Sequence, residues 1–226
     1  MSYRLRDGLS FCQVDGHAIF LDIQNDRYFR LPDEMERTFL AYADGDARQA
    51  LSVRELVSRN IFVDTQSKVD RITSCRAEPT KRSAMEQAHS ARQKSIATLM
   101  RVFTIVYSVR RRLKSRGLQR LLNDLTSYRE QSTQHAVVAS TASLEYRLSE
   151  SAAAFRYARL CVPVDTCCLL DSISMITFLA SRGFHSTIVF GVTAAPFSAH
   201  CWVQIGDMVL NDHVGHVQAY TPIKVV

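Results

Sequence analysis

Three residues in the C-terminal part of the chain have the types and the spacing of a thiol-based catalytic site: Cys168, His200 and Asp212. The apolar periodicity around Cys168 predicts a helix of about four turns over residues 165–183, with Cys168 in its first turn. There the helix dipole and free backbone N–H groups can lower a thiol pKa from about 8.5 to between ~3.5 and ~7.5. A first-turn N–H could also stabilise an oxyanion once the thiolate attacks a carbonyl.

After residue 183 the periodicity changes from helical to alternating, which predicts three strands at 185–192, 199–205 and 208–211. The loop between the last two strands decides what faces His200. A two-residue loop would place His213 opposite His200, whereas a three-residue loop, Ile205–Asp207, pairs His200 with Asp212. We expect the three-residue loop, in which Asp212 fixes the tautomer of the His200 ring and stabilises its charged form.

Other interpretations of these residues stay open at this point. A buried structural thiol with a surface histidine is the commoner reason for such residues in a sequence. The adjacent Cys167 lies about 100° away around the predicted helix, so only one of the two thiols can face His200. His213 and His216 follow Asp212 closely, and either could replace His200 as the base.

The composition is that of a globular protein, with 46% hydrophobic and 22% charged residues. The first residues lack the apolar core of a signal peptide, and no stretch has the roughly 20 uncharged residues of a membrane span. We therefore expect a cytoplasmic protein whose six cysteines are thiols. The sequence has no C-x-x-C pair and no phosphate-binding loop, so neither a metal nor another cofactor is expected.

Residues 101–120 hold seven basic side chains and no acidic one, although the whole chain has a net charge of only +6. A basic helix can bind nucleic acid or a membrane surface, but such runs are more often solvated helix faces. The rival hypothesis to an enzyme is therefore a winged-helix regulator without catalysis, whose basic helix contacts nucleic acid. We expect no nucleic-acid partner.

The organisation along the chain predicts an α+β protein of two domains. Residues 1–75 are expected to form a small module with strands at 9–14, 18–23 and 28–31 followed by helices at 33–42 and 47–60. Residues 76–94 are polar and are expected to be a linker, and residues 95–226 form the second domain.

Three motifs of the second domain, CLLDSISMITFLASRGF at 168–184, PFSAHCWV at 196–203 and LND at 210–212, carry a family resemblance. Together they resemble the transglutaminase-like leader peptidases of lasso peptide biosynthesis. The resemblance implies a papain-like cysteine protease fold with Cys168, His200 and Asp212 as catalytic residues and Trp202 beside the histidine. In that family a small residue lies four positions after the nucleophile, and Ser172 at that position favours Cys168 over Cys167.

The first 75 residues resemble the PqqD-like recognition element, a winged-helix-like domain that captures the leader of a precursor peptide. In that family the leader adds a strand to the third strand and packs on the last helix, which is β-augmentation. The resemblance places the leader groove at six residues: Arg27, Tyr28, Phe29, Val53, Leu56 and Val57. For the last three, a place in the core of the module is an equally good interpretation.

The two resemblances together imply a peptidase that binds a ribosomally made precursor peptide and cuts leader from core. The cut would proceed through a thioester with Cys168 that water hydrolyses. The resemblance also implies a partner, an ATP-dependent lasso cyclase of the asparagine-synthetase type, which would close the macrolactam on the freed core.

Overall fold

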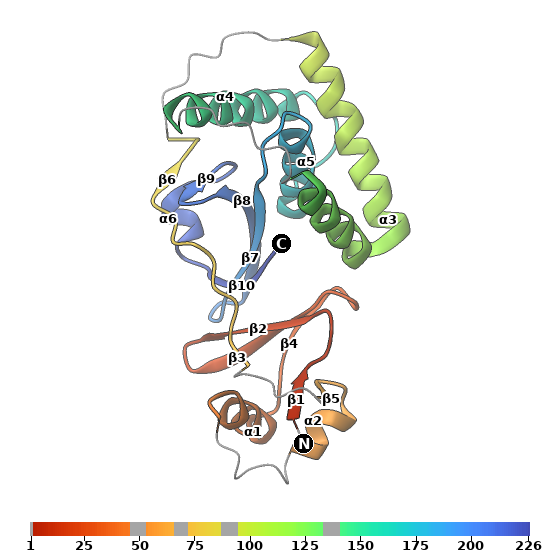
Figure 1. Ribbon diagram of the computed structural model, residues 1–226, viewed down its shortest axis with the longest axis vertical. Helices are drawn as coiled ribbons and strands as arrows, with labels where there is room; N and C mark the ends of the chain where they lie inside the picture. The colour runs from red at the N-terminus through yellow and green to blue at the C-terminus, as the bar shows by residue number, and fades with distance from the viewer. Residues whose placement is uncertain (1, 46–52, 66–71, 87–94, 133–140) are drawn as a thin grey trace.

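The computed structural model describes residues 2–45, 53–65, 72–86, 95–132 and 141–226. Some residues of the predicted helix at 47–60 and the end of the predicted linker, residues 87–94, lie outside these ranges. The chain is a mixed α+β structure. In Figure 1 the helices α3, α4 and α5 lie at one end, and the N-terminal strands and helices lie at the other.

The N-terminal region is built on an antiparallel meander of three strands, β2 (Leu9–Val14), β3 (His17–Asp22) and β4 (Arg27–Arg30). The first hairpin turns through Asp15 and Gly16, whose φ angles of 52° and 83° suit a tight turn. The three strands predicted from the sequence are thus confirmed. A second pair joins β1 (Ser2–Leu5) to β5 (Phe62–Thr65), and α1 (Asp33–Ala43) and α2 (Val53–Ser58) complete this region.

The two faces of the meander belong to two different cores. Phe11 and Phe20 pack around Phe39 of α1 in the core of the N-terminal region. Cys12 and Leu21 face the other way and belong to the main core of the C-terminal region. Because both faces are covered, five of the six residues of β3 are buried.

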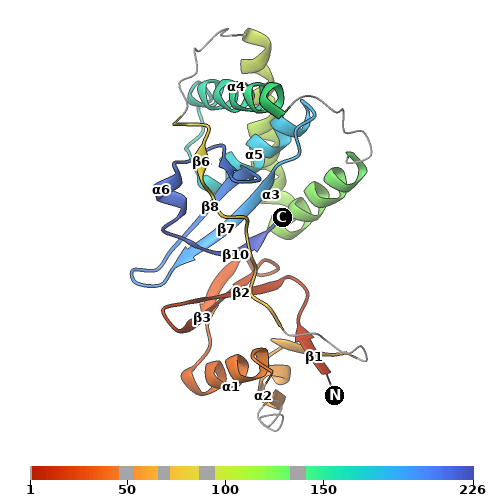
Figure 2. The ribbon, with the colours of Figure 1, turned by 60° about the vertical axis from the view of Figure 1, so that its left-hand side comes forward.

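The C-terminal region holds a five-stranded sheet in the order β10-β7-β8-β9-β6. Its strands are β6 (Arg82–Ser83), β7 (Thr187–Thr193), β8 (Ser198–Ile205), β9 (Met208–Val209) and β10 (Thr221–Val225). The helices are α3 (Ile96–Ser132), α4 (Thr141–Leu160), α5 (Cys168–Ala180) and the short α6 (Val214–Val217). The meander β2-β3-β4 lies next to β10 in both side views (Figures 1 and 2).

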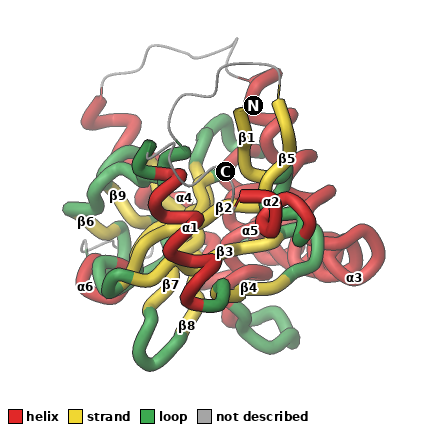
Figure 3. The backbone as a smooth tube through the Cα atoms, turned by 90° about the horizontal axis from the view of Figure 1, so that it is seen from below, coloured by secondary structure: helices red, strands yellow, loops and turns green. Residues whose placement is uncertain are grey.

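Helix α3 is broken once along its length, at Gly117, whose φ of 75° and ψ of 166° are far from helical values. Only glycine takes such a backbone conformation without strain. Gly117 therefore divides α3 into two helical segments. Seen from below, α3 lies at the rim of the molecule, away from α6 (Figure 3).

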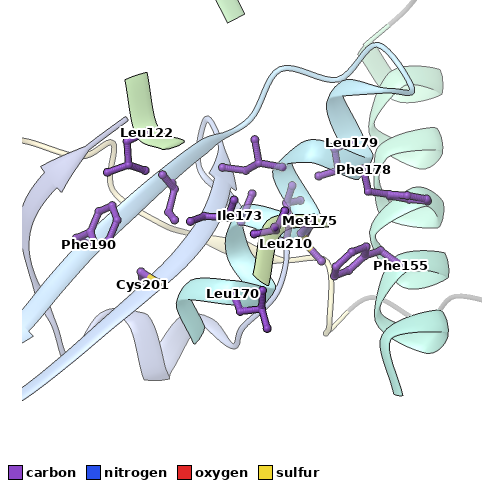
Figure 4. Packing of buried hydrophobic residues seen from close by; sticks show 14 of the residues in the cluster. Leu122, Phe155, Leu170, Ile173, Met175, Phe178, Leu179, Phe190, Cys201 and Leu210 are labelled. Carbon is purple, nitrogen blue, oxygen red and sulfur yellow. The ribbon is translucent and has the colours of Figure 1, made fainter. Parts of the chain in front are cut away.

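Helix α5 lies at the centre of the C-terminal core. Ile173, Met175, Phe178 and Leu179 are fully buried, and Phe155 of α4 packs against Phe178 with ring centroids 5.5 Å apart. Figure 4 shows these side chains between the strands on one side and α4 on the other. Because this packing surrounds the helix, the position of its first turn is fixed relative to β8.

The described residues of the segment expected to be a linker lie against the C-terminal sheet. β6 pairs in parallel with β9, and Arg82 forms ion pairs with Asp207 at 2.7 Å and with Glu145 of α4 at 3.0 Å. The connection between the two regions of the chain is therefore itself an edge of the sheet. Among the described residues, no helix is long and apolar enough to cross a membrane.

Candidate active site

Cys168 lies in the first turn of α5, as the sequence predicts, but the helix is shorter than expected: it runs over Cys168–Ala180, with Cys167 in the N-cap position and an extended backbone (φ −144°, ψ 128°). Cys167 is exposed, whereas Cys168 is half-buried and packs against the main core. The phase of the helix thus turns the Cys168 thiol, and not the Cys167 thiol, toward the interior. At this position the thiol lies at the positive end of the helix dipole.

The loop before α5 is fixed by one buried arginine. Arg159 donates to Asp171 Oδ1 at 2.6 Å and to the carbonyl oxygens of Val164 and Asp165, both at 3.0 Å. The Arg159 side chain is only 6% exposed, so these charge-assisted hydrogen bonds lie in a region of low polarity. They tie the end of α4, the loop and the first turn of α5 into one unit that carries Cys168.

Cys168 interacts with two neighbours on β8, Cys201 and His200. Hydrogen bonds from the Cys201 thiol and from the His200 ring lower the pKa of Cys168 to about 4, although burial acts in the opposite direction. The hydrogen bond to Cys168 and burial raise the pKa of Cys201, so Cys201 remains a thiol and acts as the donor. The arrangement favours a Cys168 thiolate at neutral pH.

His200 is the positive partner of that thiolate. Burial disfavours its charged form, but hydrogen bonds with Asp212 and Cys168 outweigh this and raise the pKa of His200 to about 9. Its Nε2 lies 2.6 Å from Asp212 Oδ2 and donates to this carboxylate. Nδ1 is therefore the ring nitrogen left for Cys168. A thiolate–imidazolium pair is the activated nucleophile of a cysteine hydrolase.

Asp212 receives more hydrogen bonds than the one from His200. Its Oδ2 also accepts from Nδ1 of His216 at 2.8 Å, and its Oδ1 accepts from the backbone N–H of His213 at 2.7 Å. Although burial opposes ionisation, these hydrogen bonds lower the pKa of Asp212 to about 2. The carboxylate is thus charged over the whole range in which the His200–Cys168 pair exists.

The expected three-residue loop between β8 and β9 is wrong. Ile205 pairs with Met208 and Gln204 with Val209, so the loop has two residues, Gly206 and Asp207. In a continued ladder this register would place His213 opposite His200. The pairing ends after Leu210, however, whose N–H still donates to the Val203 carbonyl at 2.8 Å, and His213 turns instead toward Glu86, at 3.5 Å.

Asn211 is the residue that ends this ladder. Its Oδ1 accepts from the backbone N–H of Val203 at 2.8 Å, in the place that a backbone carbonyl would fill in a continued hairpin. The Leu210 carbonyl instead accepts from Arg156 of α4 at 2.7 Å. Asn211 Nδ2 also donates to Ser172 Oγ at 2.9 Å, and this contact links the segment to α5. The chain leaves the sheet at Asn211. Asp212 contacts His200 because of this change in chain direction, and not because the two residues pair across the strands.

Residues of the segment before α3 hold Asp212 from the other side. Ser83 Oγ of β6 donates to the backbone carbonyl of Asp212 at 2.5 Å, and Glu86 Oε1 accepts from the N–H of Val214 at 3.1 Å. The Ser83 side chain is buried. Residues more than a hundred positions apart in the sequence therefore position the carboxylate.

Aromatic rings surround the side of His200 that faces α6. The ring centroid of Tyr220 lies 5.3 Å from that of His200, and the centroid of His216 lies 4.9 Å away. Trp202 packs beside His200 at 6.3 Å, and its indole N–H donates to Gln204 Oε1 at 2.8 Å. These contacts leave the His200 ring little freedom to rotate away from Asp212.

One group of described residues has the geometry to hold a metal ion: His200, Asp212 and His216, whose ligand atoms lie within 4.8 Å of one another. These atoms already form the two hydrogen bonds that Asp212 Oδ2 accepts from the two histidines, so all three side chains have partners without a metal ion. The chemistry of thiolate, imidazole and carboxylate fits covalent acyl transfer, which needs no metal.

The six residues assigned to a leader groove do not lie on one open surface. Val53 and Leu56 are 1% and 0% exposed and belong to the core around α1, so they offer a peptide no free surface; Val57 is half-buried. The Arg27 guanidinium lies over the Phe29 ring, 5.2 Å from its centroid, and Phe29 stacks on Phe20. Tyr28 points to the opposite face of β4, toward the C-terminal core.

The comparison with known families identifies the C-terminal region. A model described as the transglutaminase-like superfamily matches residues 103–225, more than half of the chain, and the chain therefore belongs to this superfamily. Its domain is a papain-like cysteine hydrolase fold, in agreement with the thiol at the first turn of α5 and with the mixed α+β architecture. No curated protein and no solved structure matches the chain.

Sequence reasoning missed several residues of the site: Ser83, Arg156, Arg159, Cys201, Asn211 and Tyr220. Some of these residues make long-range contacts, and others have side chains that take the place of a backbone hydrogen-bond partner. A local sequence pattern indicates neither kind of contact. Ser172 is different, because its position four residues after Cys168 gave a signal, and its Oγ indeed bridges α5 to the Cys201 carbonyl at 3.2 Å.

Proposed function

We propose that this protein is a cysteine peptidase that cuts the leader from a ribosomally made precursor peptide. In the proposed reaction the Cys168 thiolate attacks the carbonyl carbon of the scissile peptide bond. His200 then gives its proton to the leaving amine, and the acyl group remains on Cys168 as a thioester. Water, deprotonated by His200, hydrolyses the thioester and restores the thiolate–imidazolium site.

The observation that carries this proposal is the thiolate–imidazolium pair in a half-buried position. The pKa of Cys168 is lowered to about 4 and that of His200 is raised to about 9, so the nucleophile and the general acid coexist at neutral pH. A structural thiol would show the opposite shift, as Cys12 does, where burial raises the pKa to about 12.

Capture of a leader strand by the N-terminal region is supported by the topology of its sheet. β4 is an edge strand, and among the described residues no strand pairs with its outer side. Such an edge presents backbone donors and acceptors to an extended peptide, which is the basis of β-augmentation. The exposed Arg27 and the half-buried Phe29 would contact that peptide; Val57 is the remaining helical candidate.

We further propose that the freed core passes to a separate ATP-dependent lasso cyclase of the asparagine-synthetase type. Hydrolysis of the leader bond yields a new α-amino group on the core, which is the nucleophile that macrolactam closure requires. Carboxylate activation would then belong to the cyclase, because peptide hydrolysis by a thiolate needs no ATP.

The direct test uses the full-length protein with a synthetic leader–core peptide and product analysis by mass spectrometry. We expect a single cleavage by the unaltered protein, none by Cys168→Ala, and normal cleavage by the matched control Cys167→Ala. Loss of cleavage in Cys167→Ala alone would show that the other thiol is the nucleophile. Release of ammonia or transfer of the acyl group to an added amine, without hydrolysis, would assign a transglutaminase reaction instead.

A further inference from the structure

Tyr28 belongs to the N-terminal region by sequence but to the C-terminal core by position. It pairs with Leu21 of β3, and both side chains lie on the face of the meander that packs against the C-terminal region. Its neighbour Phe29 pairs with Phe20 and lies on the opposite face. The alternation of a strand therefore separates these two adjacent aromatic residues into two different environments.

The Tyr28 ring contacts the loop that precedes the histidine strand. Its centroid lies 5.7 Å from that of Phe197, with an angle of 60° between the rings. Phe197 is 54% exposed and comes three residues before His200 on the chain. One ring from the N-terminal meander and one from the loop before β8 thus meet beside the candidate active site.

The Tyr28 side chain packs against the same core cluster that contains Cys201 and against which Cys168 packs. Burial raises the pKa of Tyr28, and the negative charge of the Cys168 thiolate raises it further. A phenol that is held in its protonated form is a hydrogen-bond donor. Among the residues that the structure describes, this hydroxyl has no hydrogen-bond partner, although the side chain is half-buried.

An exposed aromatic ring and a hydroxyl without a protein partner can both bind an extended peptide. A ring surface binds a flat or apolar side chain, and a fixed hydroxyl binds a backbone carbonyl. A hydroxyl without a partner in the protein is available to donate to a substrate carbonyl in place of water.

We propose that Tyr28 and Phe197 form a substrate subsite beside Cys168. The subsite takes an aromatic or large apolar side chain of the peptide on the Phe197 ring, while the Tyr28 hydroxyl donates to a backbone carbonyl of the same segment. This inference rests on the proposed peptidase function. The meander β2-β3-β4 then forms one side of the site. A peptide bound at the β4 edge and the subsite next to its scissile bond would both contact this sheet.

The first test does not depend on cleavage. In the Cys167→Ala background, the rates at which Cys168 reacts with N-phenylmaleimide and N-ethylmaleimide are compared by mass spectrometry of the peptide that contains Cys168. The two reagents share one reactive group and differ in an aromatic ring. We expect the phenyl reagent to react about tenfold faster in the unaltered subsite, and Phe197→Ala to remove most of this preference.

The matched control is Phe103→Ala, which removes an aromatic ring on α3 that is 38% exposed. It should keep the phenyl preference. An equal preference in Phe197→Ala and in Phe103→Ala would overturn the aromatic half of the subsite. Because this readout needs no peptide bond to be cut, it decides the subsite even if no precursor is cleaved, in which case only the proposed function fails.

The second test uses Tyr28→Phe, which removes the hydroxyl and keeps the ring. With a leader–core peptide we expect kcat/KM to fall about tenfold, while the affinity for the isolated leader and the alkylation rate of Cys168 by iodoacetamide stay within about twofold. Tyr146→Phe, a tyrosine on α4 that is 63% exposed, is the control. An unchanged kcat/KM, or a loss confined to leader affinity, would refute a hydroxyl contact at the active site.

Discussion

Asp212 Oδ2 lies 2.6 Å from His200 Nε2, although the register of the β8–β9 hairpin would pair His200 with His213. The contact exists because the chain leaves the sheet at Asn211, whose side chain replaces a backbone partner of Val203. The geometry of the site thus depends on an interrupted hairpin. An interruption of this kind can re-aim a side chain at a functional site.

The pH dependence of Cys168 reactivity follows from the two shifted pKa values. The thiolate forms above about pH 4, and His200 loses its proton above about pH 9, so the ion pair exists between these limits. We expect alkylation of Cys168 by iodoacetamide to be fast already at about pH 6, where only a small fraction of an ordinary thiol, on the order of 10⁻³, is ionised. Peptide cleavage should follow a bell-shaped profile between the same limits.

His200→Ala provides the control for this profile. Without the imidazolium the thiolate loses one of its stabilising hydrogen bonds, and the inflection of the alkylation curve should move to higher pH. A curve with an inflection near that of an ordinary thiol, about pH 8.5, in the unaltered protein would contradict the ion pair.

The carboxylate of Asp212 should be needed for turnover more than for folding. Asp212→Asn keeps the shape of the side chain but removes the charge that stabilises the His200 imidazolium, and we expect kcat to fall by about 10² to 10⁴. His216→Ala removes the second, exposed histidine on the same oxygen and should cost less than about tenfold. Steady-state kinetics on both variants measures this difference, and equal losses would show that the two histidines act as a unit.

Asn211 should matter for stability as well as for the site. Asn211→Ala leaves the buried N–H of Val203 without a partner, which costs about 1–3 kcal/mol of unfolding free energy. Asn211→Asp keeps the acceptor oxygen and should lose less. Urea unfolding of the two variants gives the comparison, and an Asn211→Ala variant as stable as the unaltered protein would argue against the interrupted-hairpin account.

Gly191 lies opposite His200 on β7, where a side chain has no room. A Cβ there would be 2.8 Å from Trp202 Cζ3 and 2.8 Å from Tyr220 Cβ. Gly191→Ala should therefore displace the rings beside His200 and cost about 1–3 kcal/mol of stability, with reduced kcat.

Gly215 offers the matched control, because apart from its chain neighbours and its own helix backbone no atom lies within 4 Å of the Cβ that alanine would add there. Gly215→Ala should leave stability within about 1 kcal/mol of the unaltered protein. Thermal unfolding and kinetics on both variants check the pair. Equal behaviour of the two alanines would show that the Trp202 and Tyr220 contacts can relax.

Leu21 connects the two regions of the chain. It is 1% exposed in the main core although it belongs to the N-terminal meander. We expect Leu21→Ala to cost about 2–5 kcal/mol and to lower the stability of both regions together in one transition. Two separate transitions in urea, with only the first one shifted, would show that the regions fold independently.

The sequence by itself determined the local elements and the chemistry of the site. The 3.6-residue period placed Cys168 in the first turn of α5, because one helix face must be buried in a core. Alternation and turn residues located the meander β2-β3-β4 and the strand that carries His200. These features are set by short-range periodicity, and the structure confirms them.

Only the tertiary structure decided how these pieces meet. The loop of the β8–β9 hairpin was predicted one residue too long, because nothing local shows that Asn211 would replace a backbone partner. The support of Asp212 by Ser83 and the contact of Tyr28 with Phe197 join residues that are more than a hundred positions apart. Such contacts depend on how two packed sheets share one core, and no pattern along the chain encodes that arrangement.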